Sequence, residues 1–304
     1  MDKTQHITLS SPLRRGFALM ITLSVLSVVI ALTVVLLGYF SEVKKDSDTT
    51  KALIQADVFY ADILSQFSKF KDKKALFNHL YRFPVSLRAA KGRFSMMLKC
   101  EPLAKGMNIN WLGLEQDKAH PNLFLEADAL FANLVQLYGV EDADRFREML
   151  LEEIGGKKKF VKKEQSRLRQ KNGIISYKQF SEIVSRYQLE VDDPKVSAIP
   201  WERYFSFSGK AQKIDAEYSS PEFISLLFDI DLTSVREWHN ALDKSALSTF
   251  VIENGGNYEE KKSLLAGGAF LGESLCAVNY GAGYRFTFKY IEGEAKYFEF
   301  YGKH

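Results

Sequence analysis

The side chains in this sequence that could do chemistry are mainly carboxylates, and they occur in short clusters. Three such clusters are present: Asp192-Asp193, the pair Asp229 and Asp231, and the group Glu141, Asp142 and Asp144. Carboxylate oxygens are the ligands that a hard cation such as calcium prefers. None of the clusters has the spacing of an EF-hand loop. We therefore expect helix ends or solvated loops at these positions, with calcium binding as the alternative.

No combination of residues typical of an active site is found in the sequence. It lacks the GxSxG, HExxH and CxxC patterns and a phosphate-binding loop. The run GAGYRF at 281–286 lacks the third glycine and the following helix of a dinucleotide site. The five histidines form no i,i+3 or i,i+4 pair with one another or with a cysteine, so no zinc spacing occurs. We expect a protein without enzymatic activity.

The sequence has two cysteines, Cys100 and Cys276. In a reducing compartment such residues are most often small buried thiols. In an oxidising compartment they could form one disulfide, and closing so long a loop would contribute about 5 kcal/mol. The sequence leaves both interpretations open.

Composition and charge limit the partners. The 304 residues carry 41 Lys and Arg against 38 Asp and Glu, a net charge of +3, so nucleic acid is not expected. A basic segment, KKKFVKKEQSRLRQK at 157–171, is either a solvated loop or helix face, or a docking patch for an acidic partner.

An apolar stretch near the N-terminus must position the rest of the chain. From Phe17 to Phe40 the phenol of Tyr39 is the one ionisable side chain. At about 1.5 Å per residue this stretch spans a bilayer of roughly 30 Å as a helix. Arg14 and Arg15 precede it, which favours a single-pass protein with a cytoplasmic N-terminus and the bulk of the chain on the other side of the membrane.

The sequence after the apolar stretch continues as an amphipathic helix. It has no Gly or Pro before Pro84, and its apolar residues recur at spacings of three and four. We therefore predict one helix over 17–78, with 17–40 transmembrane. The expected apolar face is Ile54, Val58, Phe59, Ile63, Phe67 and Phe70.

The remaining chain is predicted to form an α+β fold. Strands are expected within 85–100 and in a hairpin of Tyr284–Ile291 and Ala295–Tyr301, whose alternating Phe286, Phe288 and Tyr290 share one face. Helical spacing covers 123–138, 142–154, 176–184, 221–227 and 234–247. Because the early strand needs the late hairpin to complete a sheet, we predict a sheet domain of 79–107 and 251–304 with an α-helical insertion of 108–250.

The Arg-Arg-Gly sequence and the apolar run that follows it resemble the leader region of a prepilin. The sequence RRGFALMITLSVLSVVIAL is similar to the leaders of type IV pilin-like proteins, which a prepilin peptidase cuts after the glycine before methylating the new N-terminus. The resemblance implies a leader of residues 1–16, with Gly16 and Phe17 at the processing site. The fifth mature residue is usually Glu in this superfamily, and here it is Ile21.

That departure is shared with the minor pseudopilin K family of type II secretion. Family members carry an INLN-like segment at the start of a helical insertion and an INxNTAPxEVL-like segment near its end. Here Asn108-Ile109-Asn110 resembles the first and the run from Ile214 to Ile224 resembles the second, with Asp215 in place of an asparagine and with Pro221 and Glu222 kept. Residues 175–180 and 204–209 resemble two further family segments.

The resemblance implies a pilin-like fold, with a long N-terminal helix, a small antiparallel sheet and a large α-helical insertion. It implies a non-enzymatic minor pseudopilin at the tip of the type II secretion pseudopilus, which initiates or caps its assembly. The implied partners are other minor pseudopilins through the N-terminal helix, the prepilin peptidase and the inner membrane. The implied location is the cell inner membrane, with a cytoplasmic N-terminus and a periplasmic C-terminal domain. Calcium is the implied cofactor, although the acidic run that family members carry inside the insertion is absent here.

Two alternatives stay open at the level of the sequence. One is a minor pilin of a type IV pilus or a DNA-uptake machine, which would share the leader and the helix. The other is a membrane-anchored periplasmic module that binds a ligand within 108–250. Cleavage and methylation at Gly16 and Phe17 distinguish the last alternative from the other two.

Overall fold

The structure, a computed structural model, describes residues 13–88, 95–155, 173–209, 211–241, 243–281 and 283–302. Predictions about residues 1–12 and about the basic segment 157–171 lie outside these residues. The chain divides into two units, residues 1–63 with 302–304 and residues 64–301, and we describe each by itself.

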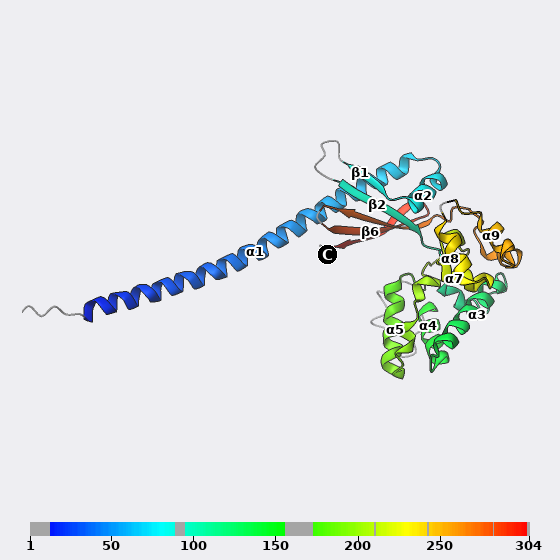
Figure 1. The fold of residues 1–304 in the computed structure, drawn as a ribbon, viewed down its shortest axis with the longest axis horizontal. Coiled ribbons are helices and arrows are strands. Elements are labelled where there is room, and N and C mark those ends of the chain that lie inside the picture. Colours follow the sequence, from blue (N-terminus) through cyan, green and yellow to red (C-terminus); the bar gives the residue numbers. More distant parts are fainter. Residues whose placement is uncertain are drawn as a thin grey trace, which may run out of the picture. The chain divides into compact units, whose positions relative to one another are not determined.

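Helix α1, Leu13–Lys69, is continuous over 57 residues and is drawn in blue in Figure 1. The sequence predicted that it would run to residue 78, but a second helix, α2 (Lys73–Arg82), begins after a short break. Asp72 caps α2, because its carboxylate accepts a hydrogen bond from the backbone N–H of Ala75 at 2.9 Å. A capping acid thus marks the start of the second helix.

The apolar face predicted for this helix is partly wrong. Ile54, Val58 and Phe70 are exposed, at 59%, 54% and 50%. The buried positions are Ala52, Ala56, Ile63 and Phe67, which recur at helical spacings on a single face. The prediction placed the buried face wrongly because it counted only large apolar side chains and left out the alanines.

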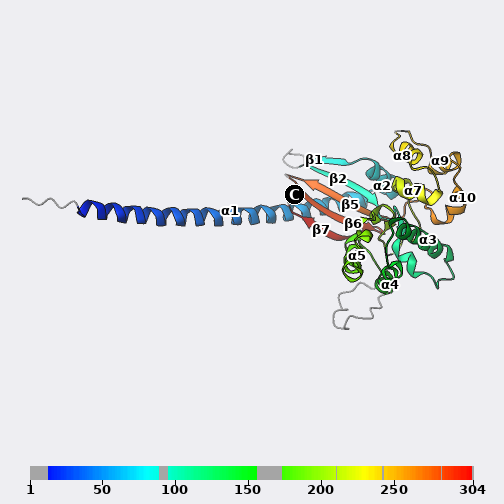
Figure 2. The same ribbon diagram turned by 60° about the horizontal axis from the view of Figure 1, so that its bottom comes forward.

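The unit of residues 64–301 contains a five-stranded antiparallel sheet in the order β1-β2-β5-β6-β7 (Figure 2). Its strands are β1 (Val85–Arg88), β2 (Ser95–Pro102), β5 (Glu273–Tyr280), β6 (Tyr284–Ile291) and β7 (Glu294–Tyr301). The predicted hairpin is confirmed as β6 and β7, and the predicted early strands as β1 and β2. The sequence did not single out β5, which lies between β2 and β6.

One face of this sheet packs on aromatic side chains from the helices. Phe286, Phe288 and Tyr290 of β6 are all buried, as their alternation predicted. Phe77 of α2 lies 4.9 Å from Tyr290 and 5.3 Å from Phe67, measured between ring centroids. Aromatic pairs at such separations are attractive beyond the apolar area that they bury. Aromatic side chains therefore form much of the core on this face of the sheet.

The helical insertion enters after β2 and leaves before β5, two strands that pair directly with each other. Near its start lies the short strand β3 (Met107–Asn108), which pairs in parallel with β4 (Phe205–Ser206), a strand from later in the insertion. The helices are η1 (Ile109–Gly113), α3 (Pro121–Tyr138), α4 (Ala143–Ile154), α5 (Tyr177–Val191), α6 (Lys195–Ala198), η3 (Trp201–Arg203), η4 (Ala216–Tyr218), α7 (Pro221–Phe228), α8 (Leu232–Asn240), α9 (Leu247–Glu253), α10 (Tyr258–Lys261) and η5 (Lys262–Leu264). Helices therefore continue past residue 250, the predicted end of the insertion.

The helix predicted over 234–247 is also wrong. Helix α8 ends at Asn240 and α9 starts at Leu247. The indole N–H of Trp238 donates to the carbonyl of Ser245 at 3.0 Å, which links α8 to the residues just before α9.

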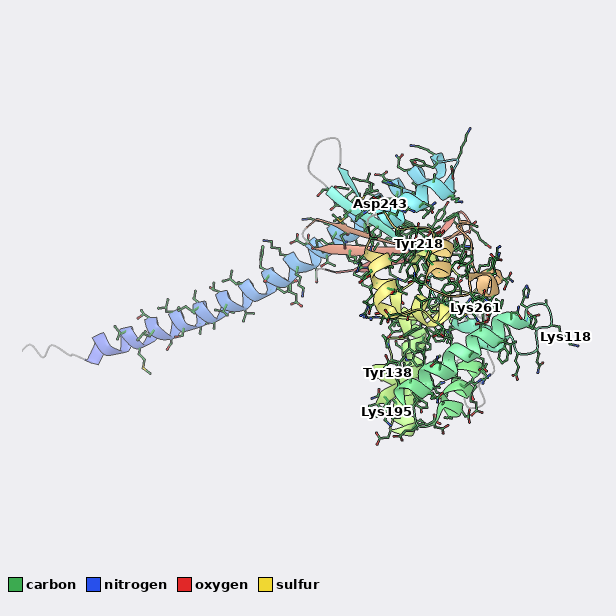
Figure 3. All side chains as sticks on the ribbon, turned by 45° about the vertical axis from the view of Figure 1, so that its right-hand side comes forward. Lys118, Tyr138, Lys195, Tyr218, Asp243 and Lys261 are labelled. Carbon is green, nitrogen blue, oxygen red and sulfur yellow. A yellow bond between two sulfur atoms is a disulfide. The ribbon has the colours of Figure 1, made fainter. Side chains whose placement is uncertain are left out.

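The insertion has its own core. Trp201 lies 5.5 Å from Phe146 and 5.4 Å from Phe180 between ring centroids, and all three side chains are fully buried. Lys261 of α10, labelled in Figure 3, forms an ion pair with Glu126 of α3 at 2.7 Å. The insertion is thus held by apolar contacts between helices that are distant in sequence.

Candidate functional site

The outer surface of α1 is the first candidate site. Between Leu19 and Leu37 the large apolar side chains are 48–69% exposed. An 18-residue window of this helix has a mean hydropathy of 2.8, so it is long and apolar enough to span a membrane. Gly16 and Phe17 lie in the first turns of α1, and their side chains lie outside the described part of the chain. Ile21 belongs to the exposed apolar surface, at 48%.

The first motif segment, Asn108-Ile109-Asn110, holds three parts of the insertion together. Asn108 caps η1 by accepting the backbone N–H of Asn110 at 3.1 Å, and its own amide donates to the carbonyl of Ser208 at 2.9 Å. Asn110 accepts the N–H of Ile174 at 2.7 Å and donates to the carbonyl of Ile174 at 2.9 Å. The motif is therefore structural: it satisfies buried backbone groups that would otherwise lose their hydrogen bonds.

The second motif segment lies beside the first. Asn108 donates to the carbonyl of Ala211 at 3.0 Å, and the N–H of Asp215 donates to the carbonyl of Ala104 at 2.8 Å. Ile214, fully buried, bridges to Leu265. Residues from both ends of the insertion thus meet where it joins the sheet, although about 100 residues separate them.

Pro221 and Glu222 begin helix α7, as predicted. Ser220 caps the helix by accepting the N–H of Phe223 at 3.1 Å, and Pro221 occupies the first turn. Glu222 accepts hydrogen bonds from Arg203 and Arg236, both at 3.0 Å. The carboxylate therefore ties η3 to α8.

A glycine next to Asn110 gives a direct test of this network. Gly173 has a φ of +81°, and a Cβ there would collide with the side-chain oxygen of Asn110. Gly255 has nearly the same φ, +80°, but open space around it. We expect Gly173→Ala to lower the free energy of unfolding by about 3 kcal/mol, because it combines left-handed strain with a lost buried hydrogen bond. Gly255→Ala should cost about 1 kcal/mol from strain alone. Equal losses in urea unfolding of the two variants would contradict this role of Asn110.

Several acids of the three clusters lie at the ends of helices. Asp142 caps α4 and Asp231 caps α8, each accepting a backbone N–H, at 2.9 and 3.0 Å. Asp192 and Asp229 end α5 and α7 in the left-handed conformation. Asp193, fully buried, accepts the backbone N–H groups of Glu141 and Lys195. The interpretation as helix ends is confirmed for these residues.

Among these carboxylates, those of Asp142, Asp193 and Asp231 accept backbone hydrogen bonds. Within the ranges that the structure describes, no group of three or more His, Cys, Asp or Glu is arranged to hold a metal ion.

The two cysteines form a disulfide. Cys100 of β2 and Cys276 of β5 are opposite each other in the sheet, and both are fully buried. The bond joins the two strands that flank the insertion. Of the two interpretations of the cysteines, the structure therefore supports a disulfide, which is typical of an oxidising compartment.

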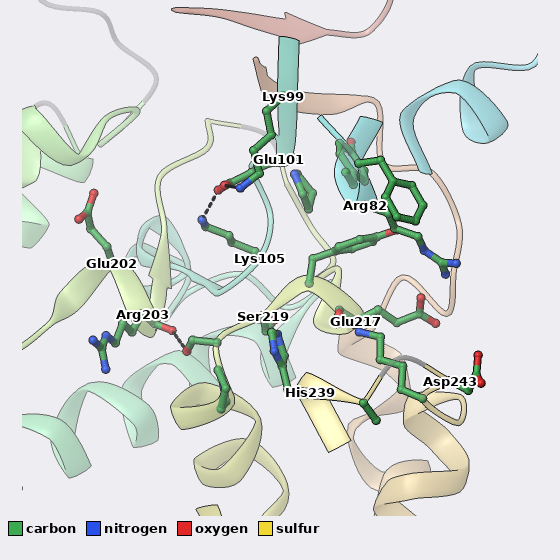
Figure 4. Close-up of a pocket in the computed structure, with 18 residues that line it drawn as sticks. Arg82, Lys99, Glu101, Lys105, Glu202, Arg203, Glu217, Ser219, His239 and Asp243 are labelled. Atoms are coloured by element: carbon green, nitrogen blue, oxygen red, sulfur yellow. Dashed lines mark hydrogen bonds and ion pairs between the residues drawn. The ribbon is translucent and has the colours of Figure 1, made fainter. Parts of the chain in front are cut away.

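A groove of about 920 Å³ lies in the second unit between α2, β2 and the loop after α8. Figure 4 shows its charged rim, where Lys99 and Lys105 both pair with Glu101, at 3.0 and 2.7 Å. Burial acts to raise the pKa of Glu101, but the two lysines hold it at about 2. The groove was not predicted, because its walls come from segments with no shared pattern.

Comparisons of this chain with models of known protein families, with curated proteins and with solved structures found no match.

Proposed function

We propose that this chain is a minor pseudopilin of type K, anchored in the inner membrane and placed at the tip of a type II secretion pseudopilus. The observation that carries the proposal is α1: an uninterrupted helix in which an exposed apolar surface starts directly after an Arg-Arg-Gly junction. Such a surface is stable only in lipid or against other apolar helices. It serves as an anchor before assembly and as the packing surface for other minor pseudopilins afterwards.

The disulfide supports the periplasmic location of the second unit. Cys100 and Cys276 are joined at the centre of the sheet, where only an oxidising compartment keeps such a bond formed. This agrees with the orientation that Arg14 and Arg15 predict for the apolar helix.

The absence of an acid at Ile21 supports a position at the tip. An ionised carboxylate inside a bilayer costs roughly 2.5 kcal/mol or more unless it is paired. In pilin-like filaments the fifth residue is expected to pair with the N-terminal amine of a neighbouring subunit. A subunit with isoleucine forgoes that partner, which suits the terminal position in a filament.

Processing at Gly16 tests the proposal. In bacteria that carry a prepilin peptidase, we expect the mature protein to begin at an N-methylated Phe17. Gly16→Leu should retain the leader, because a large side chain blocks the residue at the cut. Gly38→Leu is the matched control: it lies in the same apolar segment, has open space around it and should be processed normally.

The measurement is the mass of the intact protein and of its N-terminal peptide. A wild-type chain that keeps residues 1–16, or a Gly16→Leu chain with the mature mass, would refute the proposal. An unprocessed N-terminus would favour the membrane-anchored ligand-binding module instead. Co-purification with pseudopilins or with pilins then separates the secretion system from a type IV pilus.

A further inference from the structure

An uncharged stripe runs along helix α1 and continues well past its most apolar part. Its positions are spaced by four, three and four residues in turn, a repeat of 11 residues that keeps them on one side of a nearly straight α-helix. No lysine, arginine, aspartate or glutamate interrupts this α1 stripe. Its members, all exposed, are Leu32, Leu36, Tyr39, Val43, Ser47, Thr50, Ile54, Val58 and Ala61.

Lipid does not cover the outer end of the α1 stripe. A bilayer of roughly 30 Å is spanned by about 20 helical residues, and the apolar run ends at Phe40. Ile54 follows Phe40 by 14 residues, which is about 21 Å along a helix. Ile54 and Val58 are nevertheless 59% and 54% exposed. Two apolar side chains therefore face water above the membrane, where their exposure is unfavourable.

The rest of the described chain does not cover this part of the stripe either. The nearest buried positions of α1 are Ala52 and Ala56. At about 100° per residue, both lie roughly 160° around the helix from Ile54. One side of α1 is thus buried within the molecule, while the opposite side presents the stripe to a second helix.

Charges beside the α1 stripe indicate which helix this is. Asp46 flanks the stripe on one side and Lys51 on the other, and both are exposed. In two parallel helices, a residue beside the seam meets a residue about five positions further along on the partner, at the other side of the partner's seam. Asp46 of one copy thus meets Lys51 of a second copy, twice by symmetry. Asp57 and Asp62 have the same spacing but like charges, so they oppose pairing beyond this region.

We propose that two copies of this chain pair through the α1 stripe, as parallel helices in and just above the membrane. Ile54 and Val58 then pack against their counterparts, and Asp46 and Lys51 form an ion pair between the copies at each edge. Anchoring in one membrane makes the two helices parallel and raises their effective concentration, so a narrow interface suffices. The pairing concerns the chain before any assembly and does not rest on the proposed place in a pseudopilus.

Disulfide crosslinking of the full chain in bacterial membranes tests the pairing. The host lacks other pilin-like proteins, and the native cysteines do not interfere because they are joined and buried. An oxidant should link Ser47→Cys and Ile54→Cys chains into dimers, since equivalent positions of the stripe face each other. Lys45→Cys is the matched control, because Lys45 is exposed at nearly the same height but lies roughly 160° around the helix from Ser47. It should give about tenfold less dimer, because a disulfide needs Cα atoms within about 7 Å.

Charge reversal distinguishes a second copy from any other partner. Asp46→Lys and Lys51→Asp, each alone, place like charges at both edges and should lower the dimer yield of Ile54→Cys about threefold. The two reversals together restore opposite charges only if the partner is the same chain, so the yield should then recover. No dimer from Ile54→Cys, equal crosslinking on and off the stripe, or a double reversal as weak as the single ones would overturn the pairing. Processing at Gly16 would be unaffected by that failure.

Discussion

Replacing Cys100 and Cys276 together by alanine is expected to lower the free energy of unfolding of the second unit by about 5 kcal/mol. The bond closes a loop with a sequence separation of 176, so it removes much conformational freedom from the unfolded chain. Since domains are commonly stable by about 5–15 kcal/mol, this loss is large enough to unfold much of the protein. The strands β2 and β5 should lose most of their protection, because the bond lies between them.

Hydrogen exchange of the full chain in detergent is the appropriate measurement. The three tryptophans, Trp111, Trp201 and Trp238, all lie in the insertion, so their fluorescence reports on the helices and not on the sheet. Reduced wild-type protein is the control, because it loses the bond but keeps both sulfur atoms in the core. A double variant with unchanged exchange in β2 and β5 would show that the disulfide is not stabilising.

Asp215→Asn is expected to stabilise the protein at pH 8 by up to about 4 kcal/mol. The carboxyl has a folded-state pKa of about 7 against 3.8 for the ordinary side chain, so the folded state holds the proton more tightly. Stability from this group is therefore complete below pH 3.8 and is lost as the pH rises to 7. Asparagine carries no charge, so the variant should lack this loss.

Urea unfolding at pH 5, 6, 7 and 8 measures the effect. The difference between the variant and the wild type should grow with pH and level off above pH 7. Asp231→Asn is the matched control, since hydrogen bonds from the backbone of Ser234 hold the pKa of Asp231 below its usual value despite the opposing effect of burial. That variant should lose stability at neutral pH. A constant difference for Asp215→Asn at all four pH values would refute the explanation.

Local signals in the sequence predicted much of the fold. The cap Ser220 with Pro221 marked the start of α7, and the alternation of Phe286, Phe288 and Tyr290 marked the buried face of β6. Strand β5 was missed although a short turn joins it to β6, because the prediction paired β6 only with β7, and the other neighbour of β5, β2, lies far away in the sequence. The break between α1 and α2 was missed because it depends on one capping acid, Asp72.

The candidate site was less predictable than the fold. The resemblance singled out Asn108, Asn110 and Asp215, and the structure brings their segments together. The burial of Asp215 could not be inferred, because it depends on which segments pack over that residue. The one available signal was the acid at position 215, where the resembling family carries asparagine.

The position of the insertion between two paired strands also decides the order in which the protein can fold. As the chain is made, β1 and β2 emerge first, and β2 must then wait for the whole insertion before β5 can pair with it. The helices can gather around Trp201 and Phe146 during that interval, because their contacts need no strand. Meanwhile the open edge of β2 can pair with other chains, which is a known route to aggregation. A chaperone that covers this edge during transport would therefore protect the molecule at its most vulnerable stage.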